Sequence, residues 1–124
     1  MKKAWALAAP LLVFAAPAGA MNVQIFLNKA ERLEKRGPLA IFSSDLKLLM
    51  NQVQSDMTAL KAEKDKADAA HHPAAFCPPK NQKINMTEKD ILAAMRAVPA
   101  PRRATTDTRD ALRAYFARRF PCPA

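Results

Sequence analysis

The sequence is poor in the residues that β-sheet proteins use at their turns. It has two glycines in 124 residues, and no segment alternates apolar and polar side chains with the period of two that marks a half-buried strand. Apolar residues recur instead at the three- and four-residue spacing of a helix face. We therefore expect an all-α fold, built as a small four-helix domain.

The sequence also has few residues that could perform catalysis. Nucleophilic catalysis needs a serine, cysteine or threonine beside a base that a third group orients. Ser43 and Ser44 lie at an expected helix start, and the only two histidines, His71 and His72, are neighbours at an expected helix end. We therefore do not expect an enzyme.

A metal site is the other chemical possibility near these histidines. His71, His72 and Cys77 lie close together and offer the nitrogen and sulfur ligands that zinc and copper accept. Adjacent histidines in a proline-bounded loop are more often ordinary loop residues, and Cys77 has an expected partner in Cys122. A small metal carrier stays a third alternative, and we expect no metal and no cofactor.

Residues 1–20 have the three parts of a secretory signal peptide. Met-Lys-Lys is followed by an apolar run over residues 4–16, and Ala18 and Ala20 are the small residues that a signal peptidase accepts. A membrane anchor would need about twenty uninterrupted apolar residues, whereas this run is shorter and contains Pro10. We expect cleavage after Ala20 and a periplasmic product. No cysteine directly follows the cleavage site, so there is no residue to which a lipid could be attached.

Residues 21–124 are enough for one small domain with a single core. Loss of Lys2 and Lys3 lowers the net charge from +9 to +7, and residues 86–124 carry eight cations against four anions. A cationic surface attracts anionic lipid, peptidoglycan or an acidic protein. Export makes nucleic acid the least expected partner.

Four helices are expected in this domain, each starting at a capping residue and ending at glycine, proline or both. They run from Asn22 to Gly37-Pro38, from Asp45 to His71-His72-Pro73, from Thr87 to Val98, and from Thr105 or Thr106 to Phe120. Between the first two helices, the apolar residues 39–42 are expected to pack as a buried turn.

The two cysteines are expected to form a disulfide. An exported domain with a small core gains most from a cross-link, and the compartment is oxidising. Joining Cys77 to Cys122 closes a loop of about 45 residues, which is worth about 4 kcal/mol in the chain-entropy model. The alternative is two free or intermolecular thiols.

Two arginine pairs are the candidate binding residues. Arg102-Arg103 and Arg118-Arg119 could form one anion-binding patch if their segments are neighbours. The alternative is a solvated face on which the arginines complement helix dipoles.

Several pieces of the second half occur in a recognisable order. Phe76-Cys77-Pro78-Pro79 comes first, followed by the capped helix from Thr87, a proline-bearing turn, and a last helix that ends in Phe120-Pro121-Cys122. In this order residues 76–122 resemble the Rap/Tai-type immunity proteins of type VI secretion systems, in which a Cys-x-Pro opens a segment that an aromatic-Pro-Cys closes. The amino-terminal half lacks the further disulfide and the Gly-Tyr helix motif of that family.

The resemblance implies a small helical periplasmic protein that binds and blocks a cell-wall amidase effector without being an enzyme. It also implies that Cys77 and Cys122 are the structural pair and that Pro121 fixes the last turn. A homodimer is compatible with that role. The alternative function is a structural envelope protein that binds anionic lipid or peptidoglycan through its basic carboxy-terminal helices.

Overall fold

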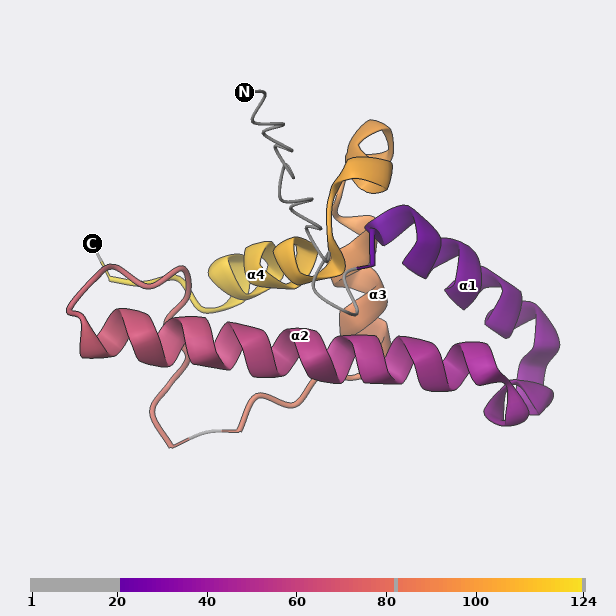
Figure 1. The fold of residues 1–124 in the computed structure, drawn as a ribbon, viewed down its shortest axis with the longest axis horizontal. Helices are drawn as coiled ribbons and strands as arrows, with labels where there is room; N and C mark the ends of the chain where they lie inside the picture. Colours follow the sequence, from indigo (N-terminus) through magenta and orange to yellow (C-terminus); the bar gives the residue numbers. More distant parts are fainter. Residues whose placement is uncertain (1–20, 82, 124) are drawn as a thin grey trace, which may run out of the picture.

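The computed structural model describes residues 21–81 and 83–123, which form helices joined by turns and one long loop (Figure 1). The expected signal peptide, with Ala18 and Ala20, lies outside the described residues. The elements are α1 (Val23–Arg36), the 3-10 turn η1 (Gly37–Phe42), α2 (Ser44–Ala69), α3 (Glu88–Arg96), the 3-10 turn η2 (Ala100–Thr105) and α4 (Thr108–Arg119). The expected all-α fold with four α-helices is confirmed for these residues.

Three helices begin at the capping residues that the sequence indicates. The side chains of Asn22 and Ser43 accept hydrogen bonds from the amides of Ile25, at 2.9 Å, and Asp45, at 3.2 Å. Thr87 and Asp90 form a capping box, in which each side chain accepts from the other residue's amide. Each cap satisfies amides that the first helical turn leaves without a partner.

The expected cap of the last helix is wrong. The hydroxyls of Thr105 and Thr106 donate to the carbonyl of Arg102, at 3.2 and 2.7 Å. They therefore satisfy an acceptor within η2 and do not cap α4. Asp107 takes the N-cap position, without a hydrogen bond from its side chain. The prolines at 99 and 101 end α3 early enough for a 3-10 turn to form before α4 begins.

The start of α4 lies against the start of α1. The amide of Val23 donates to the carbonyl of Thr106 at 2.8 Å, and the amide of Thr108 donates to the carbonyl of Met21 at 2.9 Å. These two bonds join the first described residues to the middle of the carboxy-terminal half.

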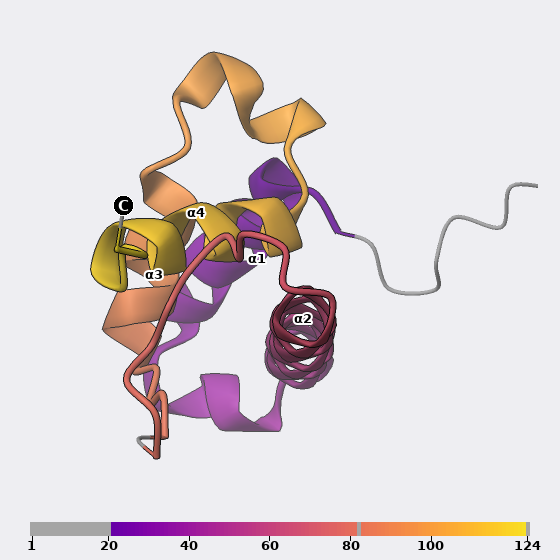
Figure 2. The same cartoon turned by 90° about the vertical axis from the view of Figure 1, so that its left-hand side faces the viewer.

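The long helix α2 lies along the longest axis of the molecule, and the other three helices lie to one side of it (Figure 2). It packs against α1 and α4, while α3 packs against α1 and α4. The core between them is formed by one buried face of each helix together with the loop residue Phe76. Its members are Val23, Phe26, Ala30, Leu33, Leu49, Leu60, Phe76, Ala94, Met95, Ala111, Leu112 and Phe116.

The disulfide holds the loop after α2 onto the end of α4. Cys77 and Cys122 are bonded, with their Cα atoms 4.9 Å apart, and the amide of Cys77 donates to the carbonyl of Phe120 at 2.8 Å. The ring of Phe76 thereby reaches the ring of Phe116, with 5.3 Å between their centroids. The expected pairing of the two cysteines is confirmed.

The expected burial of residues 39–42 is wrong. Leu39 and Ile41 are each 69 % exposed and Phe42 is 82 % exposed, whereas Ala40 is half-buried. The turn η1 lies at the end of the long axis opposite the carboxyl end of α4, where the ends of α1 and α2 extend beyond α3 and α4 (Figure 1). Its larger side chains therefore remain mostly in solvent although α1 and α2 lie on either side of the turn.

Candidate functional site

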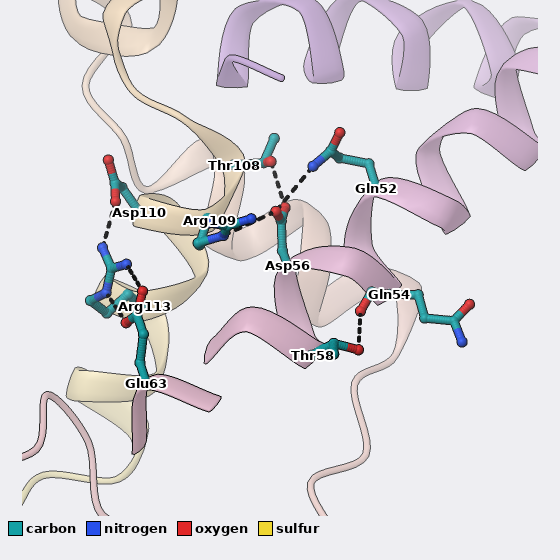
Figure 3. Close-up of polar contacts among 9 residues, drawn as sticks. All are labelled: Gln52, Gln54, Asp56, Thr58, Glu63, Thr108, Arg109, Asp110 and Arg113. Carbon is teal, nitrogen blue, oxygen red and sulfur yellow. Dashed lines mark hydrogen bonds and ion pairs between the residues drawn. The ribbon is translucent and has the colours of Figure 1, made fainter. Parts of the chain in front are cut away.

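The interface between α2 and α4 contains a buried carboxylate. Asp56 is 1 % exposed. Its Oδ2 accepts a hydrogen bond from the hydroxyl of Thr108 at 2.6 Å, and its Oδ1 accepts one from the side-chain amide of Gln52 at 3.0 Å (Figure 3). The guanidinium Nε of Arg109 lies 3.7 Å from Oδ1. Asp56 thus joins α2 to the first turn of α4.

Burial raises the pKa of Asp56 above its ordinary value of 3.8, because the charged form loses its solvation. The hydrogen bonds from Thr108 and Gln52 and the charge of Arg109 oppose that rise. The carboxylate has no exposed face toward which a substrate could approach, so the cluster serves to connect helices.

A second polar contact connects the same two helices further along. Arg113 of α4 donates from Nε and Nη2 to the carboxylate of Glu63 on α2, at 3.0 and 2.7 Å, and also pairs with Asp110 (Figure 3). These carboxylates raise the pKa of the Arg113 guanidinium further above its already high value. The bidentate geometry fixes the rotation of α4 on α2.

The structure brings together two of the four candidate arginines. Arg102 of η2 and Arg118 of α4 line one open cleft, whose floor is formed by small residues of α3 and α4 such as Ala94 and Ala111. Asp110 also lines this cleft, so its polar wall carries charges of both signs.

The other two candidate arginines lie elsewhere. Arg103 donates to the carbonyls of Val98, at 2.8 Å, and Arg96, at 3.1 Å, and so satisfies acceptors at the end of α3. Arg119 lies with its guanidinium 5.1 Å from the ring centre of Phe120 and 4.0 Å from the carboxylate of Asp90. The four side chains therefore do not form the single patch that the sequence analysis considered.

Two concave surfaces of the described chain are open to solvent. The cleft of Arg102 and Arg118 has a volume of about 190 Å³, and a groove between α1 and Arg103 has about 320 Å³. Pockets for drug-sized ligands usually hold roughly 300–1,000 Å³ and enclose most of the ligand. Both surfaces are open, and their shape suits contact with a macromolecule better than enclosure of a small substrate.

The adjacent histidines terminate α2. His71 adopts a left-handed backbone conformation with φ 54°, and the amide of His72 donates to the carbonyl of Ala67 at 2.9 Å. Both side chains are exposed. Within residues 21–81 and 83–123, no group of three histidine, cysteine, aspartate or glutamate side chains is placed to hold a metal ion.

The Asp56 cluster was not among the expected sites, although the sequence carries a signal for it. Gln52 and Asp56 lie at helical spacing with Leu49 and Leu60, so two polar residues occupy the buried face of α2. A buried polar residue needs a partner, which here is Thr108 from a distant helix. No local pattern in the sequence identifies that partner.

No helix in the described part of the chain has both the length and the apolar character needed to cross a bilayer. Comparison of the chain with models of protein families, with curated proteins and with solved structures found no match in any of the three.

Proposed function

We propose that this chain is an exported, non-enzymatic binding protein that blocks a cell-wall amidase effector, as the resemblance to the Rap/Tai-type immunity proteins implies. In this proposal residues 1–20 are a signal peptide cleaved after Ala20, and the product is periplasmic. A disulfide is compatible with that compartment.

One observation carries the proposal. The residues of the resemblance form one packed unit, in which the Cys77–Cys122 disulfide closes a loop that contains α3, η2 and α4. The aromatic rings of Phe76 and Phe116 meet inside this unit, 5.3 Å apart. The pieces that carry the likeness thus belong to a single structure instead of being scattered over the surface.

The cleft of Arg102 and Arg118 is the candidate contact surface within this unit. Both side chains are exposed, and small apolar residues line the same cleft. An amidase with carboxylates around its cleft would be attracted to such a surface. The net charge of +7 that remains after loss of Lys2 and Lys3 favours the same encounter.

The test first asks whether a cell-wall amidase is encoded beside the gene of this chain, as expected for an inhibitor and its target, and then uses that amidase. Calorimetry should detect binding between the two purified proteins, and the chain should suppress cleavage of isolated peptidoglycan by the amidase. The variant Arg102→Glu/Arg118→Glu should weaken binding by about tenfold or more, because like charges then face each other.

The matched control is Lys80→Glu/Lys83→Glu, which makes the same change in net charge in the loop before α3. It should bind as the unaltered chain does. Absence of binding and inhibition with the unaltered chain would refute the proposed function, whereas equal weakening by both variants would refute only the proposed contact surface.

A further inference from the structure

The turn η1 presents an unusual group of apolar side chains to solvent. Leu39, Ile41 and Phe42 are 69 %, 69 % and 82 % exposed, and all three come from one six-residue turn. Single exposed apolar residues are ordinary, whereas several on one protruding turn indicate a binding surface. We call these three residues the apolar elbow.

Cations lie on the helices on either side of the apolar elbow. Arg36 immediately precedes η1, Arg32 lies one turn earlier on α1, and Lys47 lies near the start of α2. The pKa of Asp45, beside the elbow, is lowered by its hydrogen bond from Lys29 and by the charges of Arg32 and Arg36. We call Arg32, Arg36 and Lys47 the cationic collar.

The carboxylates near the collar already have other partners. No salt bridge within residues 21–81 and 83–123 involves a collar residue. The neighbouring pairs are Asp45 with Lys29 at 3.1 Å, Glu31 with Lys35 at 3.6 Å, and Glu34 with Arg96 at 3.4 Å. The collar charges are therefore available to an external anion.

We propose that the apolar elbow and the cationic collar bind the surface of an anionic phospholipid bilayer. Leu39, Ile41 and Phe42 insert at the boundary between headgroups and acyl chains, and the collar contacts the phosphate groups. Apolar side chains beside cations are the combination that holds proteins to the surface of anionic membranes. The long stems of Arg and Lys let their charges stay at headgroup level.

The shape of the elbow favours a bilayer over a protein partner. Stable protein interfaces bury about 800 Å² on each side and use some 20–30 residues, which a single protruding turn does not supply. A second copy of the chain would bring two cationic collars together, and like charges repel. A bilayer needs no complementary shape and is deformable enough to accept a small convex tip.

The position of the elbow also suits this role. It lies at one end of the longest axis, while the carboxyl end of α4 and the disulfide lie toward the other end (Figure 1). Binding through the elbow would leave α4 directed away from the lipid. The inference therefore does not depend on the proposed inhibition of an amidase, and either can fail without the other.

Flotation with vesicles tests the apolar elbow. The full sequence is expressed, the protein is purified from the periplasmic fraction, and its amino terminus is determined. It should float with vesicles of phosphatidylglycerol and phosphatidylcholine and much less with phosphatidylcholine alone. The variant Leu39→Ser/Ile41→Ser/Phe42→Ser should lower the partition coefficient by about tenfold or more.

Two controls separate the elbow from general effects. Met50→Ser removes an apolar side chain that is 63 % exposed on α2 and should leave flotation unchanged. Far-ultraviolet circular dichroism and the urea midpoint should be the same for all of these proteins, because every substituted side chain is exposed. All variants share one amino terminus, so differences between them report on the substituted positions.

The collar is tested by a charge-matched pair of variants. Arg32→Gln/Arg36→Gln/Lys47→Gln should weaken binding by about tenfold or more and reduce its dependence on salt. Lys80→Gln/Lys83→Gln/Lys89→Gln makes the same change in net charge at exposed positions elsewhere and should bind nearly as the unaltered chain does.

Three results would overturn the proposal. The first is equal flotation of the unaltered protein and the elbow variant. The second is equal loss in the two charge-matched variants, which would indicate nonspecific attraction. The third is absence of flotation together with self-association that the elbow variant abolishes, which would assign the surface to a second copy of the chain.

Discussion

At the scale of single residues, Asp56 has the least ordinary environment in the described chain. Its carboxylate is almost completely buried, yet both oxygens have hydrogen-bond donors, from Thr108 and from Gln52. A buried carboxylate is costly unless such partners are present. The cluster therefore makes the position of α4 on α2 depend on a few specific atoms.

Removing one donor should show this dependence. Thr108→Val keeps the volume of a fully buried side chain but leaves Asp56 Oδ2 without its hydroxyl partner. We expect a loss of about 1–3 kcal/mol in the free energy of unfolding, measured by urea denaturation. Thr58→Val, on the exposed face of α2, is the control and should change stability by less than about 0.5 kcal/mol. Equal effects at the two positions would contradict the role of the cluster.

Asp56 should also give stability a characteristic dependence on pH. Its pKa is higher in the folded state than the unfolded value of 3.8, so the folded state holds this proton more tightly. The contribution is favourable at low pH and is lost as pH rises through the folded pKa. Asp56→Asn has no such titration, so its stability relative to the unaltered protein should increase from acid to neutral pH.

Urea denaturation of both proteins across that range measures the difference. Asp45 and Asp90, whose pKa values are lowered, contribute stability that is lost as pH falls, but they are common to both proteins and cancel. A difference in stability that stays constant with pH would show that folding does not raise the pKa of Asp56.

At the scale of the elements, local sequence patterns predicted where helices begin more accurately than which side chains are buried. The first residues of three helices could be predicted from the capping residues Asn22, Ser43 and Thr87. A cap contacts a residue within four positions along the sequence, so a local pattern suffices to identify it. The exposure of Phe42 could not be read in the same way, since it depends on how far α1 and α2 extend beyond α3 and α4. The partner of Asp56 and the separation of Arg103 from Arg102 depend likewise on distant packing.

The capping box of α3 should make a measurable contribution. Thr87→Ala removes the acceptor for the amide of Asp90, at 3.2 Å, and should lower the free energy of unfolding by about 1 kcal/mol. Thr105→Ala, in the exposed turn η2, is the control and should have a smaller effect. A result in which the two changes are equivalent would show that α3 is held by tertiary packing alone.

At the scale of the whole molecule, the disulfide compensates for a modest core. Among the described residues, twelve apolar side chains are buried, of which three are alanine and three are aromatic. The class of fold and the covalent link could be expected from composition, because helical periodicity and a single pair of cysteines leave few alternatives. The two surfaces proposed for binding could not be expected in this way, because each depends on how segments distant in sequence are placed.

Loss of the disulfide should therefore destabilise the entire domain. The bond closes a loop of 45 residues, and Cys77→Ser/Cys122→Ser should lower the free energy of unfolding by about 4 kcal/mol. Urea denaturation of the two proteins measures this difference. Titration of the unreduced, denatured protein should find no free thiol, and two thiols per chain would contradict the link.

The hydrogen bonds of Met21 and Val23 bear on the timing of maturation. A leader that ends at Ala20 would meet the domain with no spacer, since the carbonyl of Met21 already accepts from Thr108 at 2.9 Å. A protease must pair with the extended backbone on both sides of its cut, and here the carbonyl of Met21 and the amide of Val23 are already paired with Thr108 and Thr106. Processing would then have to precede the docking of the first helix, so that a domain that closes too early would keep its leader.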